Sequence, residues 1–249
     1  MTCERLLQIS ARIGRGLIES GAEAYRVEDS LHYVIEAYGL GSCQVFSIPN
    51  YLHIHLTDNE GKTHSCMSRA SSLKGVDIDK LNALNDLCRT IAKEKPTAVE
   101  ILDRLDAIEN TRQFSIPMQM LAYAVGSGGF ALFWGGVFLD AIAAAIVGAI
   151  VALAMYIMGQ LEANLFFKSL IGSALSALLT CVFIHFGLGL NRDEIIIGVF
   201  MMLLPGLMIT NFMREIIVGD WLSGVTKLMQ AFLIAGAIAL GTGIVLAFV

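Results

Sequence analysis

The feature that most constrains this chain is the uneven distribution of its charges. Of 17 Lys and Arg and 22 Asp and Glu, only four cations and six acids lie after residue 116. The stretches between these charged residues are long and apolar. A helix of about 20 apolar residues can cross a bilayer, because all its backbone N–H and C=O groups within the bilayer are hydrogen-bonded. We therefore expect an α-helical integral membrane protein, with a soluble domain at residues 1–113 and a membrane domain at residues 114–249.

Window length and charge divide the membrane domain into five expected transmembrane helices. Their approximate ranges are 117–138, 141–161, 169–190, 195–213 and 228–249. Cytoplasmic loops are enriched in Lys and Arg. If the N-terminus is cytoplasmic, Lys168, Arg214 and Lys227 lie inside and only Arg192 lies outside. The charges spread through the first 21 residues are unlike a secretory signal, so we expect a cytoplasmic N-terminus and an external C-terminus.

The soluble domain changes its hydrophobic period twice. Apolar residues recur at helical spacing in residues 4–20, and Gly21 is expected to end this first helix. The same spacing continues in a second helix, which is expected to end at Gly39. They then alternate in three short segments, 43–49, 51–58 and 62–69, and helical spacing returns in 77–93 and 97–108. We expect a cytosolic α+β domain in the order α-α-β-β-β-α-α.

Composition excludes several classes of function. Although the charged residues are concentrated before residue 117, the net charge of −5 is shared by both parts of the chain, and the cations form no basic stripe. We therefore expect no nucleic-acid partner. The five cysteines include no CxxC pair, which indicates reduced thiols. We also expect no cofactor.

Four potential metal ligands gather in the expected hairpin: His53, His55, His64 and Cys66. A two-residue turn at Asn59-Glu60 would bring them to one face, as in a tetrahedral zinc site. The sequence Asn-Glu-Gly is more typical of a three-residue loop, which moves His64 and Cys66 to the opposite face. We therefore predict no metal site.

An acidic junction follows the first helix. In "ESGAEAYRVEDSL", residues 19–31, four carboxylates surround Arg26: Glu19, Glu23, Glu28 and Asp29. Such groups can perform acid–base chemistry, and they also serve as caps at helix starts. The capping interpretation is favoured, and we expect no enzymatic activity.

The fourth expected span contains the strongest functional signal. Pro205 and Gly206 fall near its middle, and Pro205 has no N–H for the carbonyl of Met201. A broken span with polar groups beside it is typical of secondary transporters. The polar residues that follow are Thr210, Asn211, Arg214, Glu215 and Asp220. We predict a kinked or non-helical backbone at 201–206, beside a substrate-binding and translocation site.

Two further ionisable residues lie near expected span ends, Asp140 and His185. An ionisable group inside a helical bundle is a candidate for a proton pathway, and imidazole titrates near neutral pH. Both are candidates for a proton relay.

Three motifs resemble the threonine/serine exporter family of bacterial inner-membrane proteins. They are "GRGLIESGAEAYRVEDSL", "GVDIDKLNALNDLCR" and "LLPGLMITNFMREIIVGDWLSGVTKL". The resemblance implies export of small amino acids driven by the proton motive force. It also implies that a longer subunit like this chain works with a separate small membrane subunit. We expect this small subunit, a homo-oligomer, or both, to complete the exporter. Glu215 departs from the family pattern, which usually has Asp there.

These expectations combine into a hypothesis with named roles. Arg214 binds the substrate carboxylate because a guanidinium pairs bidentately, Asn211 and Thr210 orient the substrate, and Glu215 and Asp220 hold its amino group or the proton. One alternative is a dicarboxylate (succinate-like) exporter, which requires a second cation near the site, with Lys227 as the candidate. The others are a membrane-anchored hydrolase and a regulatory subunit whose partner contains the whole path.

Overall fold

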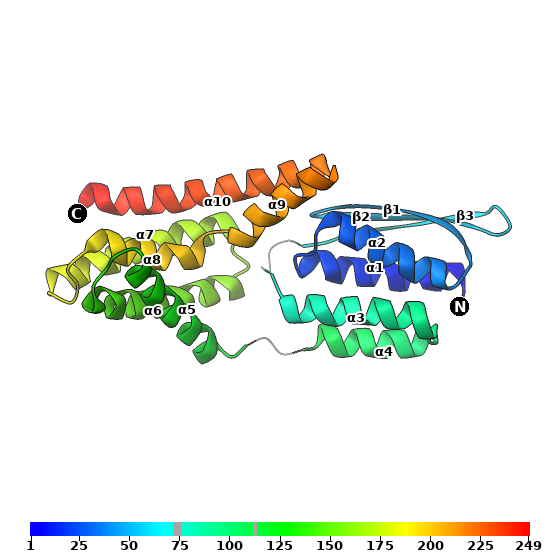
Figure 1. Cartoon of the computed structure of the whole chain (residues 1–249), viewed down its shortest axis with the longest axis horizontal. Helices are drawn as coiled ribbons and strands as arrows, with labels where there is room; N and C mark the ends of the chain where they lie inside the picture. Colours follow the sequence, from blue (N-terminus) through cyan, green and yellow to red (C-terminus); the bar gives the residue numbers. More distant parts are fainter. Residues whose placement is uncertain (72–75, 112–113) are drawn as a thin grey trace. The chain divides into compact units, whose positions relative to one another are not determined.

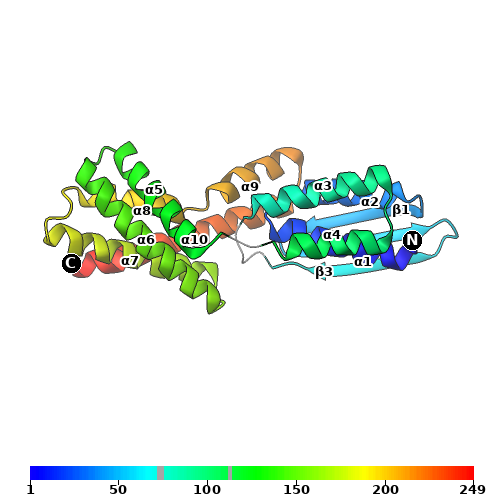
Figure 2. The ribbon, with the colours of Figure 1, turned by 90° about the horizontal axis from the view of Figure 1, so that it is seen from below.

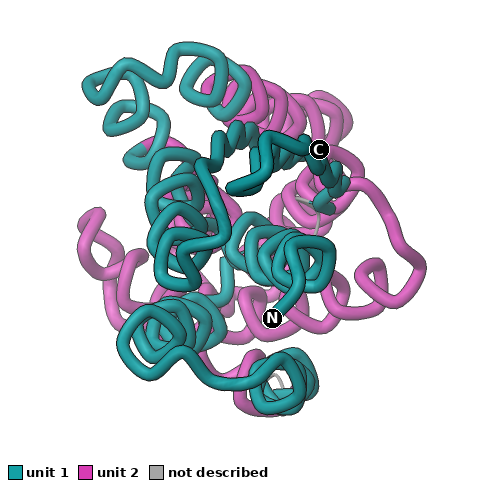
Figure 3. Tube along the Cα trace, turned by 90° about the vertical axis from the view of Figure 1, so that its right-hand side faces the viewer, with its two compact units in different colours: residues 1–112, 210–227 teal, residues 113–209, 228–249 magenta. Residues whose placement is uncertain are grey.

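The computed structural model describes residues 1–71, 76–111 and 114–249, and the chain divides into two compact units (Figures 1 and 3). Unit 1 contains residues 1–112 together with 210–227, and unit 2 contains residues 113–209 together with 228–249. Residue 113, the expected end of the soluble domain, lies outside the described residues.

The first seven elements of unit 1 follow the expected order. They are α1 (Cys3–Glu19), α2 (Ala24–Ala37), β1 (Gly41–Ile48), β2 (Tyr51–Asp58), β3 (Thr63–Arg69), α3 (Ile78–Glu94) and α4 (Ala98–Glu109). The strands form an antiparallel sheet in the order β1-β2-β3. Helices α1 and α2 pack against the sheet, and α3 and α4 pack on α1 and α2 from the other side (Figures 1 and 2).

Apolar residues of the helices and of the strands pack together in one core. The apolar stripe of α1, including Leu6 and Ile13, packs against Leu52, Ile54 and Leu56, which alternate along β2 and are fully buried. The N–H groups of Gly21 and Ala22 bond the carbonyls of Ile18 and Leu17 at 3.0 Å, and Gly21 has φ +93°. This left-handed glycine ends the helix as predicted.

The hairpin between β2 and β3 has the predicted three-residue loop. Asp58 N–H bonds the carbonyl of Lys62 at 2.9 Å, and Gly61 has φ +82°. In this register His64 lies opposite Leu56 and Cys66 opposite Ile54. His53 and His55 therefore point to the other face of the sheet, as predicted.

Unit 2 is built from apolar helices. They are α5 (Ile116–Phe133), α6 (Phe138–Gln160), α7 (Leu165–His185), α8 (Arg192–Leu203), the start of α9 (Gly206–Val218) and most of α10 (Trp221–Phe248). Within the described residues, four helices are long and apolar enough to cross a membrane: α5, α6, α7 and α10. The bent pair of α8 and α9 makes five if it counts as one span.

Helices α5, α6 and α8 touch through small residues. A Cβ at Gly148 of α6 would lie 2.3 Å from the hydroxyl of Ser127 on α5, and a Cβ at Gly198 of α8 would lie 2.6 Å from its carbonyl oxygen. There is no room for a side chain at either contact. Such close backbone approach is a common way for helices to associate in a bilayer.

The fourth expected span is broken. Helix α8 ends at Leu203, α9 begins at Gly206, and the two are bent by 54°. Leu204 is extended, with φ −64° and ψ 137°, and its N–H makes a helical bond to the carbonyl of Phe200 at 2.9 Å. Pro205 has no N–H with which to continue the ladder. The predicted kink is confirmed and lies at Leu204-Pro205.

Several helix boundaries differ from those of the expected spans; α5, for example, stops at Phe133 and not at residue 138. Helix α7 stops at His185, five residues before the expected end at residue 190. Gly187, just after the helix, adopts φ +71°. Helix α10 begins at Trp221, seven residues before the expected span at 228. Polar residues such as Lys227 therefore lie inside this helix, because a helix accepts polar side chains that a hydropathy window does not.

Candidate functional site

The turn between α9 and α10 reverses the chain within "ITNFMREIIVGDWLSGVTKL", so that polar residues of α9 lie beside polar residues of α10. Gly219 has φ +103°, and the N–H groups of Gly219 and Asp220 bond the carbonyl of Glu215 at 3.1 and 2.9 Å. The resulting helical hairpin, residues 210–227, belongs to unit 1. It places Arg214 and Glu215 of α9 and Lys227 of α10 beside the loop between α1 and α2.

Glu215 is fully buried and paired with a cation. Its Oε1 accepts hydrogen bonds from Lys227 Nζ at 2.5 Å and from the backbone N–H of Ala24 at 3.0 Å. Ala24 is the first residue of α2, so the carboxylate lies at the positive end of that helix dipole. Glu215 Oε2 is buried without a hydrogen-bond partner among the described residues.

Arg214 holds a second carboxylate. Its Nη1 donates to Oε1 of Glu23 at 2.5 Å, and Glu23 is the N-cap residue of α2. The Glu23 side chain is 5% exposed, whereas the Arg214 side chain is 52% exposed. Arg26 Nε lies 3.3 Å from Oε2, the other carboxylate oxygen of Glu23. One face of this ion pair is therefore open to solutes.

We call these five residues the charge cluster: Glu23, Arg26, Arg214, Glu215 and Lys227. It contains three cations and two carboxylates. Its polar contacts extend to the loop before α2, because Asn211 Nδ2 donates to the carbonyl of Gly21 at 3.4 Å and Lys227 Nζ approaches the carbonyl of Ala22 at 3.5 Å. The cluster thus joins the acidic junction of the sequence to the segment after the broken span.

The other predicted site residues are not members of the charge cluster. Pro205 and Gly206 belong to unit 2, at the helix break, and Thr210 is exposed at the start of the unit 1 hairpin. Asp220 lies at the turn, and its Oδ2 is buried without a hydrogen-bond partner among the described residues.

Asp220 also acts on a neighbouring carboxyl group. Glu28 on α2 accepts a hydrogen bond from the N–H of Ser47 at 2.8 Å. Burial raises the pKa of Glu28, and the charges of Asp220 and Asp29 raise it further, while the Ser47 bond opposes the shift. The Ser47 carbonyl lies 3.5 Å from the hydroxyl of Ser223 on α10. These contacts tie the hairpin to the end of β1.

Asp140 and His185 have different surroundings in unit 2. Asp140 is fully buried and accepts from the N–H groups of Val137, Leu190 and Asn191 at 3.0, 2.7 and 3.1 Å, and from Asn191 Nδ2 at 2.9 Å. These bonds join the loops before α6 and α8. His185 is exposed at the end of α7, with its ring 5.5 Å from that of Phe186. Their roles as a proton relay stay a prediction.

The hairpin of the sheet brings together potential metal ligands that the sequence interpretation did not combine. Donor atoms of Cys3, Asp58 and His64 lie within 4.8 Å of one another, and all three residues are partly buried. Asp58 Oδ2 and His64 Nε2 are 3.1 Å apart. Cys3 is remote in sequence from the hairpin, which is why the grouping did not emerge from strand register.

Sequence reasoning missed the roles of Glu23 and Lys227. Glu23 was grouped with helix caps, and it is the N-cap residue of α2, but it is also the partner of Arg214. The sequence indicates Lys227 as a cytoplasmic cation and as a possible partner of a second substrate carboxylate, whereas in the structure it pairs with Glu215. The signal was the unusual pair of Arg214 and Glu215 beside a span, because a buried carboxylate requires a cation.

Comparison with known proteins adds independent information. Residues 8–249 match the model of a family described as putative threonine/serine exporter. The threonine/serine exporter of Corynebacterium glutamicum is 23% identical over 256 residues, which cover 96% of this chain and 50% of that protein. The probable threonine/serine exporter of Mycobacterium tuberculosis is 20% identical over 241 residues, which cover 95% of this chain and 45% of that protein.

The chain thus spans about half the length of these curated relatives. No solved structure matches it significantly. The family match covers both units, from α1 to the end of α10, and includes every residue of the charge cluster. The chain belongs to the threonine/serine exporter family and is a multi-pass membrane protein.

Proposed function

We propose that this chain is a subunit of a secondary exporter that moves small amino acids of the threonine and serine type out of the cytoplasm. One observation carries the proposal: the guanidinium of Arg214, whose side chain is half-exposed, already holds a carboxylate, that of Glu23. A group that binds the Glu23 carboxylate can bind the carboxylate of an amino acid by the same chemistry.

The charge cluster suits a zwitterion better than an anion. An amino acid entering the Arg214–Glu23 pair would give its carboxylate to Arg214 and its ammonium group to Glu23, so each charge would keep an opposite partner. Asn211 and Thr210, one turn before Arg214 on α9, would orient the side chain of the substrate. The break at Pro205-Gly206 would give the helix the freedom to change its bend.

A dicarboxylate exporter remains the second candidate because Lys227 does lie in the same cluster as Arg214. The Lys227 side chain, however, is only 12% exposed, and its ammonium group is paired with the fully buried Glu215. A second substrate carboxylate would have to displace Glu215 and would lie close to Glu23. The repulsion between these carboxylates favours the amino acid.

Proton coupling and assembly are further parts of the proposal. Glu215 and Asp220 each have a buried carboxylate oxygen without a partner among the described residues, and are the candidates for the proton. The chain spans about half the length of the relatives, and we propose that it works together with a small membrane subunit or a second copy. We place the complex in the bacterial cytoplasmic membrane with the N-terminus inside and the C-terminus outside.

Everted membrane vesicles test this function directly. Vesicles containing the chain, with and without a co-expressed small subunit, are energised with a proton gradient and given labelled threonine. We expect uptake that an uncoupler abolishes, that unlabelled serine inhibits and that succinate leaves unchanged. Arg214→Ala should remove the uptake at an equal amount of inserted protein.

The outcomes separate the alternatives. Inhibition by succinate without inhibition by serine would favour the dicarboxylate exporter. Normal uptake by Arg214→Ala would refute the assigned role of Arg214. Uptake by the small subunit alone, equal to that of the complex, would make this chain a regulatory subunit. Family membership favours each of these transport functions over a membrane-anchored hydrolase, which hydrolysis of an amide or ester by purified protein would reveal.

A further inference from the structure

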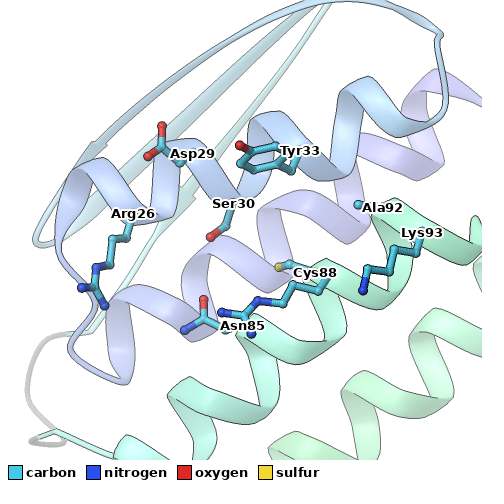
Figure 4. Close-up of a pocket in the computed structure, with 9 residues that line it drawn as sticks. Arg26, Asp29, Ser30, Tyr33, Asn85, Cys88, Ala92 and Lys93 are labelled. Atoms are coloured by element: carbon cyan, nitrogen blue, oxygen red, sulfur yellow. The ribbon is translucent and has the colours of Figure 1, made fainter.

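Helices α2 and α3 of unit 1 enclose a pocket with a volume of about 570 Å³ (Figure 4). Its lining residues recur at intervals of three or four on each helix, so each helix contributes one face. From α2 come Arg26, Ser30 and Tyr33, and from α3 come Cys88, Arg89 and Lys93. The volume lies in the range of roughly 300–1,000 Å³ that is typical of sites for small molecules.

The lining is positively charged. Three of its residues are cations, Arg26, Arg89 and Lys93, and one is an acid, Asp29. Arg89 lies 3.6 Å from Asp86, but both side chains are about three-quarters exposed, and such pairs contribute little. Lys93 forms no ion pair within the described parts of the chain. At least two cations are thus available to a negatively charged ligand.

The remaining surface suits the uncharged part of an organic ligand. Cys88 is 4% exposed, and burial raises the pKa of its thiol to about 12, so the thiol stays neutral. Tyr33 is 67% exposed, which is high for an aromatic residue, and its ring offers a flat face for stacking. Ser30 and Asn85 add groups that donate and accept hydrogen bonds.

We propose that this pocket binds a small organic anion, with a carboxylate or phosphate group and a flat or apolar portion, and that the bound anion inhibits export. Arg26 supplies the connection because it lines the pocket and also lies 3.3 Å from the Glu23 carboxylate. An anion that attracts Arg26 would leave Glu23 to Arg214 alone. The Arg214–Glu23 pair would then tighten, and a substrate carboxylate would compete less well for Arg214.

The binding step is tested on the purified full chain in detergent by isothermal titration calorimetry. Adenosine monophosphate is the phosphate probe, benzoate is the carboxylate probe, and adenosine is the uncharged control. We expect at least one of the two anions to bind with a Kd below about 1 mM. Its affinity should fall as salt is raised, because salt screens exposed charges. Adenosine should bind at least tenfold more weakly than the anion.

Variants locate the binding. Arg89→Ala with Lys93→Ala should weaken binding at least tenfold. Arg104→Ala with Lys62→Ala removes the same number of exposed cations elsewhere in unit 1 and should leave the Kd unchanged. The site is refuted if neither anion binds at 10 mM, about tenfold above the expected limit, if both double variants bind like the wild type, or if adenosine binds as tightly as the anion.

The regulatory step rests on the proposed function, whereas binding does not. In vesicles, the bound anion should lower threonine transport by the wild-type chain. In Arg26→Gln, Glu23 has already lost this partner, so transport should be low without anion and should not fall further when it is added. Binding without inhibition would overturn the coupling through Arg26. Absence of threonine transport in the wild type would refute the proposed function and leave the calorimetric result standing.

Discussion

Glu215 and Lys227 form the ion pair whose disruption should cost most. Glu215 has no exposed surface and Lys227 has 12% of its side chain exposed, so loss of either charge leaves the other without compensation from water. Glu215 also accepts the first N–H of α2, which makes the pair a connection between the helical hairpin and the soluble core.

Lys227→Met should therefore destabilise the protein by about 3–5 kcal/mol, the usual cost of breaking a buried pair. The double variant Glu215→Gln, Lys227→Met should regain most of this loss because it leaves no buried charge. Thermal unfolding of the purified chain in detergent measures both. The matched control is Lys168→Met, which removes a lysine without an ion pair among the described residues. Equal stability of Lys227→Met and the control would contradict the burial of the pair.

Glu28 leads to a prediction about pH. Its pKa is raised in the folded protein, mainly by burial, so the folded state binds this proton more tightly than the unfolded state. The wild type should then lose stability as pH rises through the folded pKa. Glu28→Gln keeps an acceptor for Ser47 but has no charge, and should melt about 2–4 °C higher at pH 7. The difference should shrink below the ordinary pKa of 4.5.

Glu36→Gln is the control for this measurement because Glu36 is an exposed carboxylate on the same helix. Melting temperatures of both variants and the wild type are compared from pH 4 to pH 8, a window of roughly the range over which carboxyl groups titrate in proteins. If Glu28→Gln and the wild type show the same dependence on pH, Glu28 is not a buried acid.

At the scale of elements, the broken span was predictable because its cause is local. A proline cannot donate the helical hydrogen bond, whatever surrounds it, and the break lies directly before Pro205. The hairpin loop was predictable for a similar reason, since Gly61 supplies the positive φ that a three-residue loop requires. The start of α10 was not predictable from hydropathy, because a helix can continue through polar residues whose side chains are paired. Lys227, for example, pairs with Glu215.

Pro205→Ala tests whether the bend is needed for transport. Alanine restores an N–H at this position and removes the ring, so α8 and α9 should straighten from the observed 54° bend. Spin labels at the exposed Asp193 and Ile217 should move apart, in a background without native cysteines. We expect threonine transport to fall at least fivefold, a barrier change of about 1 kcal/mol.

Pro117→Ala is the matched control for Pro205→Ala. Pro117 lies in the first turn of α5, where an N–H has no helical partner in any case. This variant should keep both its transport and its label distances. A straightened Pro205→Ala variant that transports normally would separate the bend from the function.

At the scale of the whole molecule, long-range pairing limited what the sequence could predict. Arg214 and Asn211 were identified as site residues because polar groups after a broken span are unusual. Their partners, Glu23 and Gly21, lie about 190 positions earlier, and no local pattern relates the two segments. The same limit applies to Arg26, whose position in both the charge cluster and the pocket follows only from packing of α2.

The central claim is that Arg214 binds the carboxylate of the substrate and Glu23 its ammonium group. Transport of threonine and of 3-hydroxybutyrate, which lacks the ammonium group, tests it most directly in Arg214→Gln and Glu23→Gln. Both variants break the same ion pair. Arg214→Gln should lose transport of both solutes, whereas Glu23→Gln should lose transport of threonine and gain transport of 3-hydroxybutyrate. Equal loss of both solutes in both variants would show that the pair is only structural and would refute the two assigned roles.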